Sequence, residues 1–79
     1  MLGDNRAMFT LKSAREMAKL SQRKAAEKIG VSVYTLGNYE NGKSYPDVPI
    51  IRKIEQTYGI PYDRLIFLPL DYDKTVNLV

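Results

Sequence analysis

The chain has 79 residues, which is enough for one small domain, and it contains neither cysteine nor histidine. It therefore lacks disulfides, the usual zinc ligands and the commonest general base, so we expect no metal, no cofactor and no enzymatic activity. It also lacks a secretory signal and an apolar run of about eighteen residues, which favours a cytoplasmic protein with no membrane partner.

The positive charge is unevenly distributed along the chain, whose 12 basic and 9 acidic residues give a net charge of +3. Between residues 10 and 43 there are seven basic and three acidic side chains, whereas from residue 61 onward there are two and three. A basic half of a small domain indicates a polyanionic partner. The alternative is an ordinary solvated face, which an excess of +4 would favour if it stood alone.

The first nine residues show no helical periodicity, so we expect residues 1–9 to form a flexible N-terminal arm. Apolar residues spaced i, i+3, i+7 then predict a helix over residues 10–19, with Thr10 as its N-cap. The apolar positions of this helix are Leu11, Ala14 and Ala18.

The stretch SQRKAAEKIGVSVYTLGNYENG, residues 21–42, predicts two short helices joined by a tight turn. Ser21 can cap a helix over residues 22–29, and Gly30 ends it because glycine tolerates the left-handed conformation that closes a helix. Ser32 can cap the second helix, which ends at Gly42. Two helices joined by a glycine-containing turn of a few residues form a helix-turn-helix.

The second helix of this pair is expected to place Leu36 and Tyr39 toward the core. Its outward face carries no charge, although an ordinary solvated helix face is rich in lysine and glutamate. The residues of that face are Val33, Tyr34, Gly37, Asn38 and Asn41. Such a face suits contact with the edges of bases better than contact with bulk water.

Gly37 is unusual because a glycine in the middle of a helix costs about 1 kcal/mol relative to alanine. One interpretation is that the helix approaches DNA so closely that a side chain would collide with it. The other is tolerated drift at an exposed position, and the sequence leaves both open.

The last third of the sequence predicts two more helices. Asp47 can cap a helix over Val48–Tyr58, and Pro49 lies in its first turn, where a missing N–H group costs nothing. The residues of this helix expected to face the core are Val48, Ile51, Ile54 and Tyr58. A short fifth helix is expected over residues 62–67, and residues 68–79 form a C-terminal tail that either frays or pairs across a dimer.

Several spaced features of residues 20–46 together resemble the helix-turn-helix of the lambda-repressor-like, Cro/C1-type (XRE) family of DNA-binding proteins. These features are Gln22, Ala26, Gly30, Ser32, Glu40, Gly42 and Pro46. The resemblance covers roughly residues 11–67. It implies an all-α fold, a compact five-helix lambda-repressor-like domain over residues 10–67, with the helix-turn-helix at helices 2 and 3.

The resemblance also implies roles for individual residues. The implied base contacts come from the second helix of the pair and are Ser32, Val33, Tyr34 and Asn38. The implied contacts to the DNA backbone are Gln22, Arg23, Lys43, Ser44 and Tyr45. The resemblance further implies a structural ion pair of Arg15 with Glu40, since a guanidinium and a carboxylate can share two parallel hydrogen bonds.

The favoured function is that of a sequence-specific regulator of the phage or mobile-element type, a repressor that binds double-stranded operator DNA as a homodimer. The alternative is a protein–protein interaction module such as an antitoxin or adaptor, in which the exposed Val33 and Tyr34 dock on a partner protein. A steep loss of affinity for random duplex DNA with rising salt would favour the first.

Overall fold

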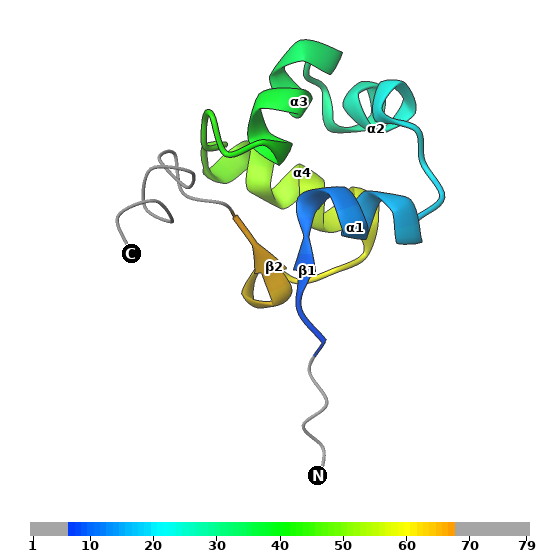
Figure 1. Cartoon of the computed structure of the whole chain (residues 1–79), viewed down its shortest axis with the longest axis vertical. Helices are drawn as coiled ribbons and strands as arrows, with labels where there is room; N and C mark the ends of the chain where they lie inside the picture. Colours follow the sequence, from blue (N-terminus) through cyan, green and yellow to red (C-terminus); the bar gives the residue numbers. More distant parts are fainter. Residues whose placement is uncertain (1–6, 68–79) are drawn as a thin grey trace, which may run out of the picture.

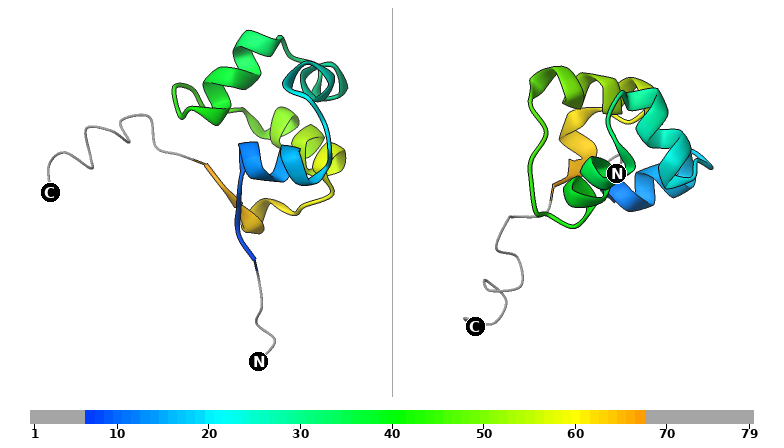
Figure 2. Two further views of the ribbon diagram at one scale, coloured as in Figure 1. Left: turned by 45° about the vertical axis from the view of Figure 1, so that its right-hand side comes forward. Right: turned by 90° about the horizontal axis from the view of Figure 1, so that it is seen from above.

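The computed structural model describes residues 7–67, in which four helices surround a small core (Figure 1). The helices are α1 (Leu11–Met17), α2 (Gln22–Ile29), α3 (Val33–Glu40) and α4 (Val48–Tyr58), followed by the short 3-10 turn η1 (Tyr62–Arg64). Two short strands, β1 (Phe9–Thr10) and β2 (Leu65–Ile66), pair in parallel. Figure 2 shows α2 and α3 at the opposite end of the molecule from this pair.

Each helix begins where a side chain caps its first turn. The cap oxygens of Thr10, Ser21, Ser32 and Asp47 each accept a hydrogen bond from the backbone N–H group three residues later. These bonds confirm the starts predicted for all four helices. Gly30 and Gly59 end α2 and α4 in the left-handed conformation, with φ of 95° and 71°.

The first helix is shorter than predicted. It ends at Met17, and Lys19 adopts a φ of 61°, so the chain turns before the expected end at Lys19. The Lys19 N–H group still donates to the Glu16 carbonyl at 2.9 Å, which closes the helix with a tight turn. The turn brings Leu20, which packs partly against the core, to the start of α2.

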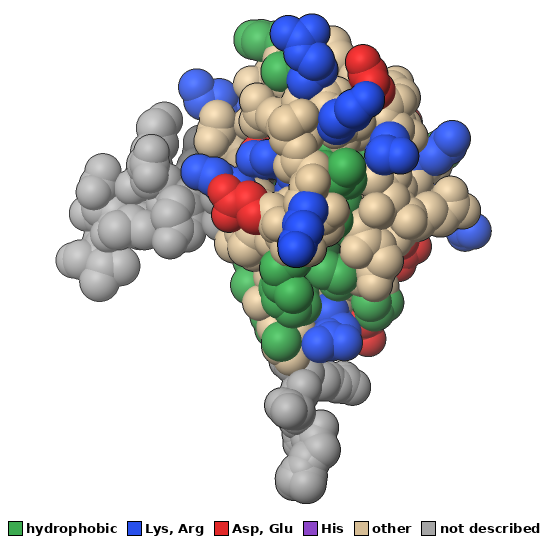
Figure 3. All heavy atoms as spheres, turned by 90° about the vertical axis from the view of Figure 1, so that its right-hand side faces the viewer, with side chains coloured by type: hydrophobic (Ala, Val, Ile, Leu, Met, Phe, Trp, Pro, Cys, Tyr) green, Lys and Arg blue, Asp and Glu red, His purple; other side chains and the backbone are tan. Residues whose placement is uncertain are grey.

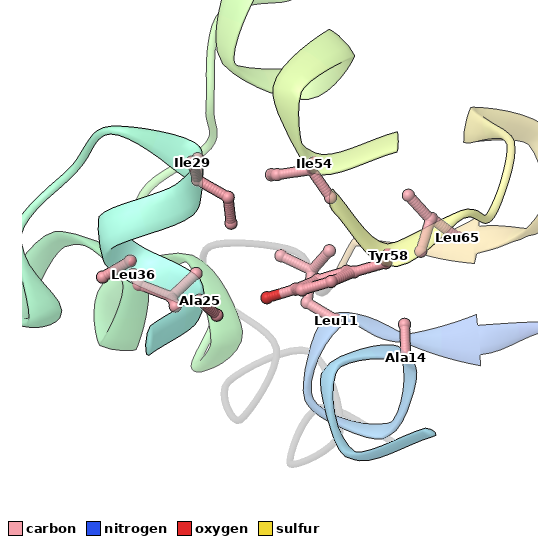
Figure 4. Close-up of a cluster of buried hydrophobic side chains, with 9 residues drawn as sticks. Leu11, Ala14, Ala25, Ile29, Leu36, Ile54, Tyr58 and Leu65 are labelled. Carbon is pink, nitrogen blue, oxygen red and sulfur yellow. The ribbon is translucent and has the colours of Figure 1, made fainter. Parts of the chain in front are cut away.

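The core is formed by side chains from all four helices and from β2 (Figure 4). Its buried members are Leu11, Ala14, Ala25, Ala26, Ile29, Leu36, Ile54, Tyr58 and Leu65. The prediction that Val48 and Ile51 face this core is wrong, because Val48 is 60% exposed and the half-buried Ile51 does not pack against the core. Val48 lies six residues before Ile54 and therefore about 120° around the helix from it, whereas Ile50 lies about 40° away and packs on the core.

The predicted fifth helix is also wrong. Only η1 is helical, and Leu65 already has the extended backbone angles φ −99° and ψ 137°. Leu65 pairs with Phe9 and Ile66 with Thr10. Side chains alternate across a strand, so Leu65 is buried at 6% exposure while Ile66 is 39% exposed. A buried leucine followed by an exposed isoleucine is compatible with a helix and also with a two-residue strand. The strand forms here because β1 lies alongside as its pairing partner.

The N-terminal boundary of the domain lies earlier than expected, because Phe9 belongs to β1 and packs against the core. Arg64 fastens this end of the chain, since its Nε donates to the Ala7 carbonyl at 3.0 Å and its guanidinium lies 5.8 Å from the centre of the Phe9 ring. The rest of the predicted arm, residues 1–6, and the predicted tail, residues 68–79, lie outside the described residues. Among residues 7–67, no helix is long and apolar enough to cross a membrane.

Candidate nucleic-acid interface

The turn between α2 and α3 fixes how the two helices meet. The N–H groups of Gly30 and Val31 both donate to the Ala26 carbonyl, at 2.8 and 3.0 Å, and Val31 packs partly against the core. Ser32 then starts α3: its Oγ accepts from the Thr35 N–H group at 3.0 Å and donates to Thr35 Oγ1 at 2.9 Å. The hydroxyl of this predicted base contact is thus engaged in capping, which orients the first turn of α3.

The outward face of α3 carries apolar surface where a solvated helix would carry charge. Tyr34 is 78% exposed and Val33 is 41% exposed, while Leu36 on the opposite side is completely buried. Asn38 is half-buried and follows Tyr34 by one helical turn, so these two side chains share a face. The structure therefore places three of the predicted base contacts on the side of α3 that faces away from the core.

The predicted ion pair lies behind this surface. Arg15 Nε donates to Glu40 Oε2 at 2.7 Å and its Nη2 donates to Oε1 at 3.3 Å, with side-chain exposures of 11% and 5%. Arg15 Nη1 also donates to the Leu20 carbonyl at 3.1 Å, at the entry to α2. The hydrogen bond to Glu40, opposed by partial burial, raises the pKa of the Arg15 guanidinium. The pair joins α1 to the last turn of α3.

Gln22 is the third member of this network, and no pattern in the sequence indicated its contact with Glu40. Its Nε2 donates to Glu40 Oε1 at 3.1 Å, so one N–H group of a predicted phosphate contact is engaged inside the protein. Because a carboxylate only accepts hydrogen bonds, the amide nitrogen faces Glu40, and its second N–H group is left for another acceptor. Arg23, the neighbouring predicted contact, is exposed at the start of α2.

The loop after α3 holds the remaining predicted backbone contacts. Lys43 is exposed, and its N–H group donates to the Asn38 carbonyl at 2.8 Å, which holds the start of the loop against α3. Ser44 is half-buried. The Tyr45 hydroxyl is 3.0 Å from that of Tyr62, and this hydrogen bond raises the pKa of Tyr45. Tyr45 is therefore tied to the C-terminal part of the domain rather than to α3.

An open groove lies beside Tyr45 and is lined largely by apolar side chains at the start of α4 and in η1. The ring of Phe67 lies 5.0 Å from that of Tyr45 and 5.6 Å from that of Tyr62, measured between ring centres. Val48 and Tyr62, both on the groove, are 60% and 47% exposed. This apolar surface is separate from the face formed by α3.

Basic side chains gather on the face that includes α2. Figure 3 shows lysine and arginine side chains spread over the upper part of this face, with few acidic ones among them. Lys24 and Glu27 form an exposed ion pair there at 4.0 Å, with side-chain exposures of 66% and 65%. No cluster of three potential metal ligands of the Cys, His, Asp or Glu type occurs within residues 7–67.

Known proteins are similar to this chain over the four helices described above. Residues 11–65 match the family described as helix-turn-helix. The chain is 36% identical over 56 residues to the HTH-type transcriptional regulator ImmR of Bacillus subtilis (strain 168), covering 71% of this chain and 44% of that protein. It is 30% identical over 70 residues to the SPbeta prophage-derived uncharacterized HTH-type transcriptional regulator YonR of the same organism, covering 85% of this chain and 65% of that protein.

The chain matches less than two thirds of the length of either relative. The matched segment nevertheless contains the α2–α3 pair, the ion pair behind it and the two helices that support it. The chain belongs to the Cro/C1-type helix-turn-helix family of transcriptional regulators.

Proposed function

We propose that this protein binds double-stranded DNA in a sequence-specific manner, with α3 in the major groove of an operator. The observation that carries the proposal is the uncharged outer face of α3, where Val33 and Tyr34 are exposed beside Asn38. The major groove admits an α-helix and presents a distinct pattern of donors, acceptors and methyl groups for each base pair. An uncharged helix face of this kind is suited to that pattern.

Each side chain of this face has a matching chemistry. Val33 meets a thymine methyl group through apolar contact, and Asn38 bonds adenine through N6 and N7 together. Tyr34 either donates to a base or lies along the backbone. The Ser32 hydroxyl, although engaged with Thr35, keeps a lone pair for a donor on a base.

The start of α2 supplies the contact to the DNA backbone. The first N–H groups of a helix have no partner within the helix and carry the positive end of its dipole, so they attract a phosphate. Gln22 and Arg23 lie at this helix start, and the exposed Lys43 lies in the loop that follows α3. In this arrangement the phosphate contacts fix the register and α3 reads the sequence.

We further propose that the protein acts as a homodimeric repressor of the phage or mobile-element type. The relative named as SPbeta prophage-derived supports the phage association. A dimer on a two-fold operator places two copies of α3 in successive major grooves, about 34 Å apart. Occupancy of such a site excludes polymerase without any further activity. Analytical ultracentrifugation with and without the operator tests the dimer.

The direct test of the proposed function is selection from a randomised duplex library, followed by affinity measurements as a function of salt. We expect a two-fold symmetric sequence to emerge, and we expect the affinity for random duplex to fall steeply as salt rises. A second candidate function, a protein-interaction module, is favoured by the 78% exposure of Tyr34. It would be supported by the absence of any enriched sequence together with no salt-dependent binding of duplex DNA.

A further inference from the structure

The glycine in the middle of α3 faces another side chain of the protein. A Cβ atom placed on Gly37 would lie 3.7 Å from Nε2 of Gln22, which is an ordinary van der Waals distance. A methyl group therefore fits at this position, but a branched side chain would extend into the space that the Gln22 amide occupies. The sequence offered two explanations for this glycine, close approach to DNA and drift, and this contact provides a third.

The Gln22 amide is held on another side by Glu40. Its Nε2 donates to Glu40 Oε1 at 3.1 Å, and Glu40 is itself fixed by Arg15 at 2.7 Å and is only 5% exposed. The Glu40 carboxylate is therefore held in place, and it restrains the Gln22 amide that donates to it. The result is a glutamine at the start of α2 whose nitrogen is turned toward α3 and whose second N–H group is directed by that bond.

We propose that Glu40 and Gly37 are positioning residues for Gln22: Glu40 orients the amide, and Gly37 leaves the room in which it lies, so that the second N–H group meets a DNA phosphate. This inference rests on the proposed function. It assigns the glycine to a contact within the protein, between α2 and α3, and not to clearance from DNA.

Prior orientation matters because a glutamine side chain has three rotatable bonds, and freezing them on binding weakens the complex. In this protein the bond to Glu40 restrains the amide before DNA arrives. The same hydrogen bond links α2, which contacts the DNA backbone in this proposal, to α3, which contacts the bases.

The free protein provides the first test, because the chain has a second glutamine, Gln56, which is exposed on α4. Nitrogen-15 relaxation of the two side-chain NH₂ groups should show Gln22 rigid and Gln56 mobile on the nanosecond timescale. Gly37→Val should make the Gln22 signal resemble that of Gln56. Equal mobility of the two glutamines in the unmodified protein would overturn the proposal.

Binding of duplex DNA provides the second test, as a cycle of Gln22→Ala, Gly37→Val and the double variant. Valine has a higher helix propensity than glycine, so the melting temperature should show that Gly37→Val remains folded. We expect each single substitution to weaken binding roughly three- to tenfold, the range that corresponds to one neutral hydrogen bond. The double variant should bind no more weakly than Gln22→Ala alone, because the amide that valine displaces is already gone.

The outcomes separate this inference from the function on which it rests. If Gly37→Val weakens binding by the same factor with and without Gln22, valine collides with the DNA itself and the positioning role is wrong. It is also wrong if Gly37→Val leaves the affinity unchanged. Gly37→Ala completes the series, since its Cβ fits at 3.7 Å and its effect should be much smaller than that of valine. If the unmodified protein binds no duplex at all, the proposed function itself fails.

Discussion

Substituting Arg15 by methionine tests whether a buried ion pair holds α1 to the helix that carries the proposed base contacts. Methionine keeps an unbranched apolar stem and removes the charge and its donors. The substitution leaves the Glu40 carboxylate, only 5% exposed, with the single hydrogen bond from Gln22. Removing one partner of a buried pair costs about 3–5 kcal/mol, and because Gln22 remains we expect the lower end, about 3 kcal/mol.

A double-mutant cycle separates the pair from the packing of each side chain. Glu40→Gln keeps the shape of the side chain and should cost about 2–3 kcal/mol, since Arg15 retains its bond to the Leu20 carbonyl at 3.1 Å. The double variant should be little worse than either single one, which gives a coupling of about 2 kcal/mol. An exposed pair typically contributes only ~0–1 kcal/mol.

The measurement is urea unfolding followed by circular dichroism, with linear extrapolation to water. The chain contains a matched control in the exposed pair Lys24–Glu27, at 4.0 Å with exposures of 66% and 65%. Its coupling should be too small to resolve. A coupling between Arg15 and Glu40 no larger than that of the control would refute the idea that this pair holds α1 to α3.

Three further substitutions test the core, the buried hydroxyl and the phosphate contact. Ile54 is completely buried, so Ile54→Ala should lower the free energy of unfolding by roughly 2–5 kcal/mol, and a loss under ~0.5 kcal/mol would place it outside the core. The Tyr58 hydroxyl has no hydrogen-bond partner among residues 7–67, and burial raises its pKa from 10.0 to about 12. The unfolded chain therefore loses this proton first, and stability should fall as the pH rises from 10 to 12; urea unfolding across this range should show a shallower fall for Tyr58→Phe. Gln22→Ala should weaken all duplexes about equally in a binding titration, whereas an altered sequence preference in library selection would contradict its contact with a phosphate.

The helix starts could be predicted because a cap is a local interaction. Thr10, Ser21, Ser32 and Asp47 each bond a backbone group only three residues away, so the residue type and its spacing contain the whole interaction. The helix-turn-helix follows for the same reason, since the glycine and the two caps that define it lie within one short stretch.

The two-stranded pair could not be predicted because it depends on two ends of the domain meeting. Phe9 and Leu65 become strand partners only after α1 and α4 have packed, and two-residue strands leave no periodic pattern in the sequence. The bond between Gln22 and Glu40 has a similar origin. The sequence shows a glutamine and a glutamate at these positions. Gln22 Nε2 and Glu40 Oε1 lie 3.1 Å apart only because α2 packs against α3.

If α3 reads the base sequence, the affinity for an operator depends on Asn38. Asn38→Ala should be compared with the unmodified protein on the operator obtained by selection and on a scrambled duplex of the same length. We expect the affinity for the operator to fall by about 1–3 kcal/mol and the affinity for the scrambled duplex to stay nearly unchanged. An equal fall on both duplexes would make Asn38 a backbone contact, and no fall on either would contradict its place in the interface.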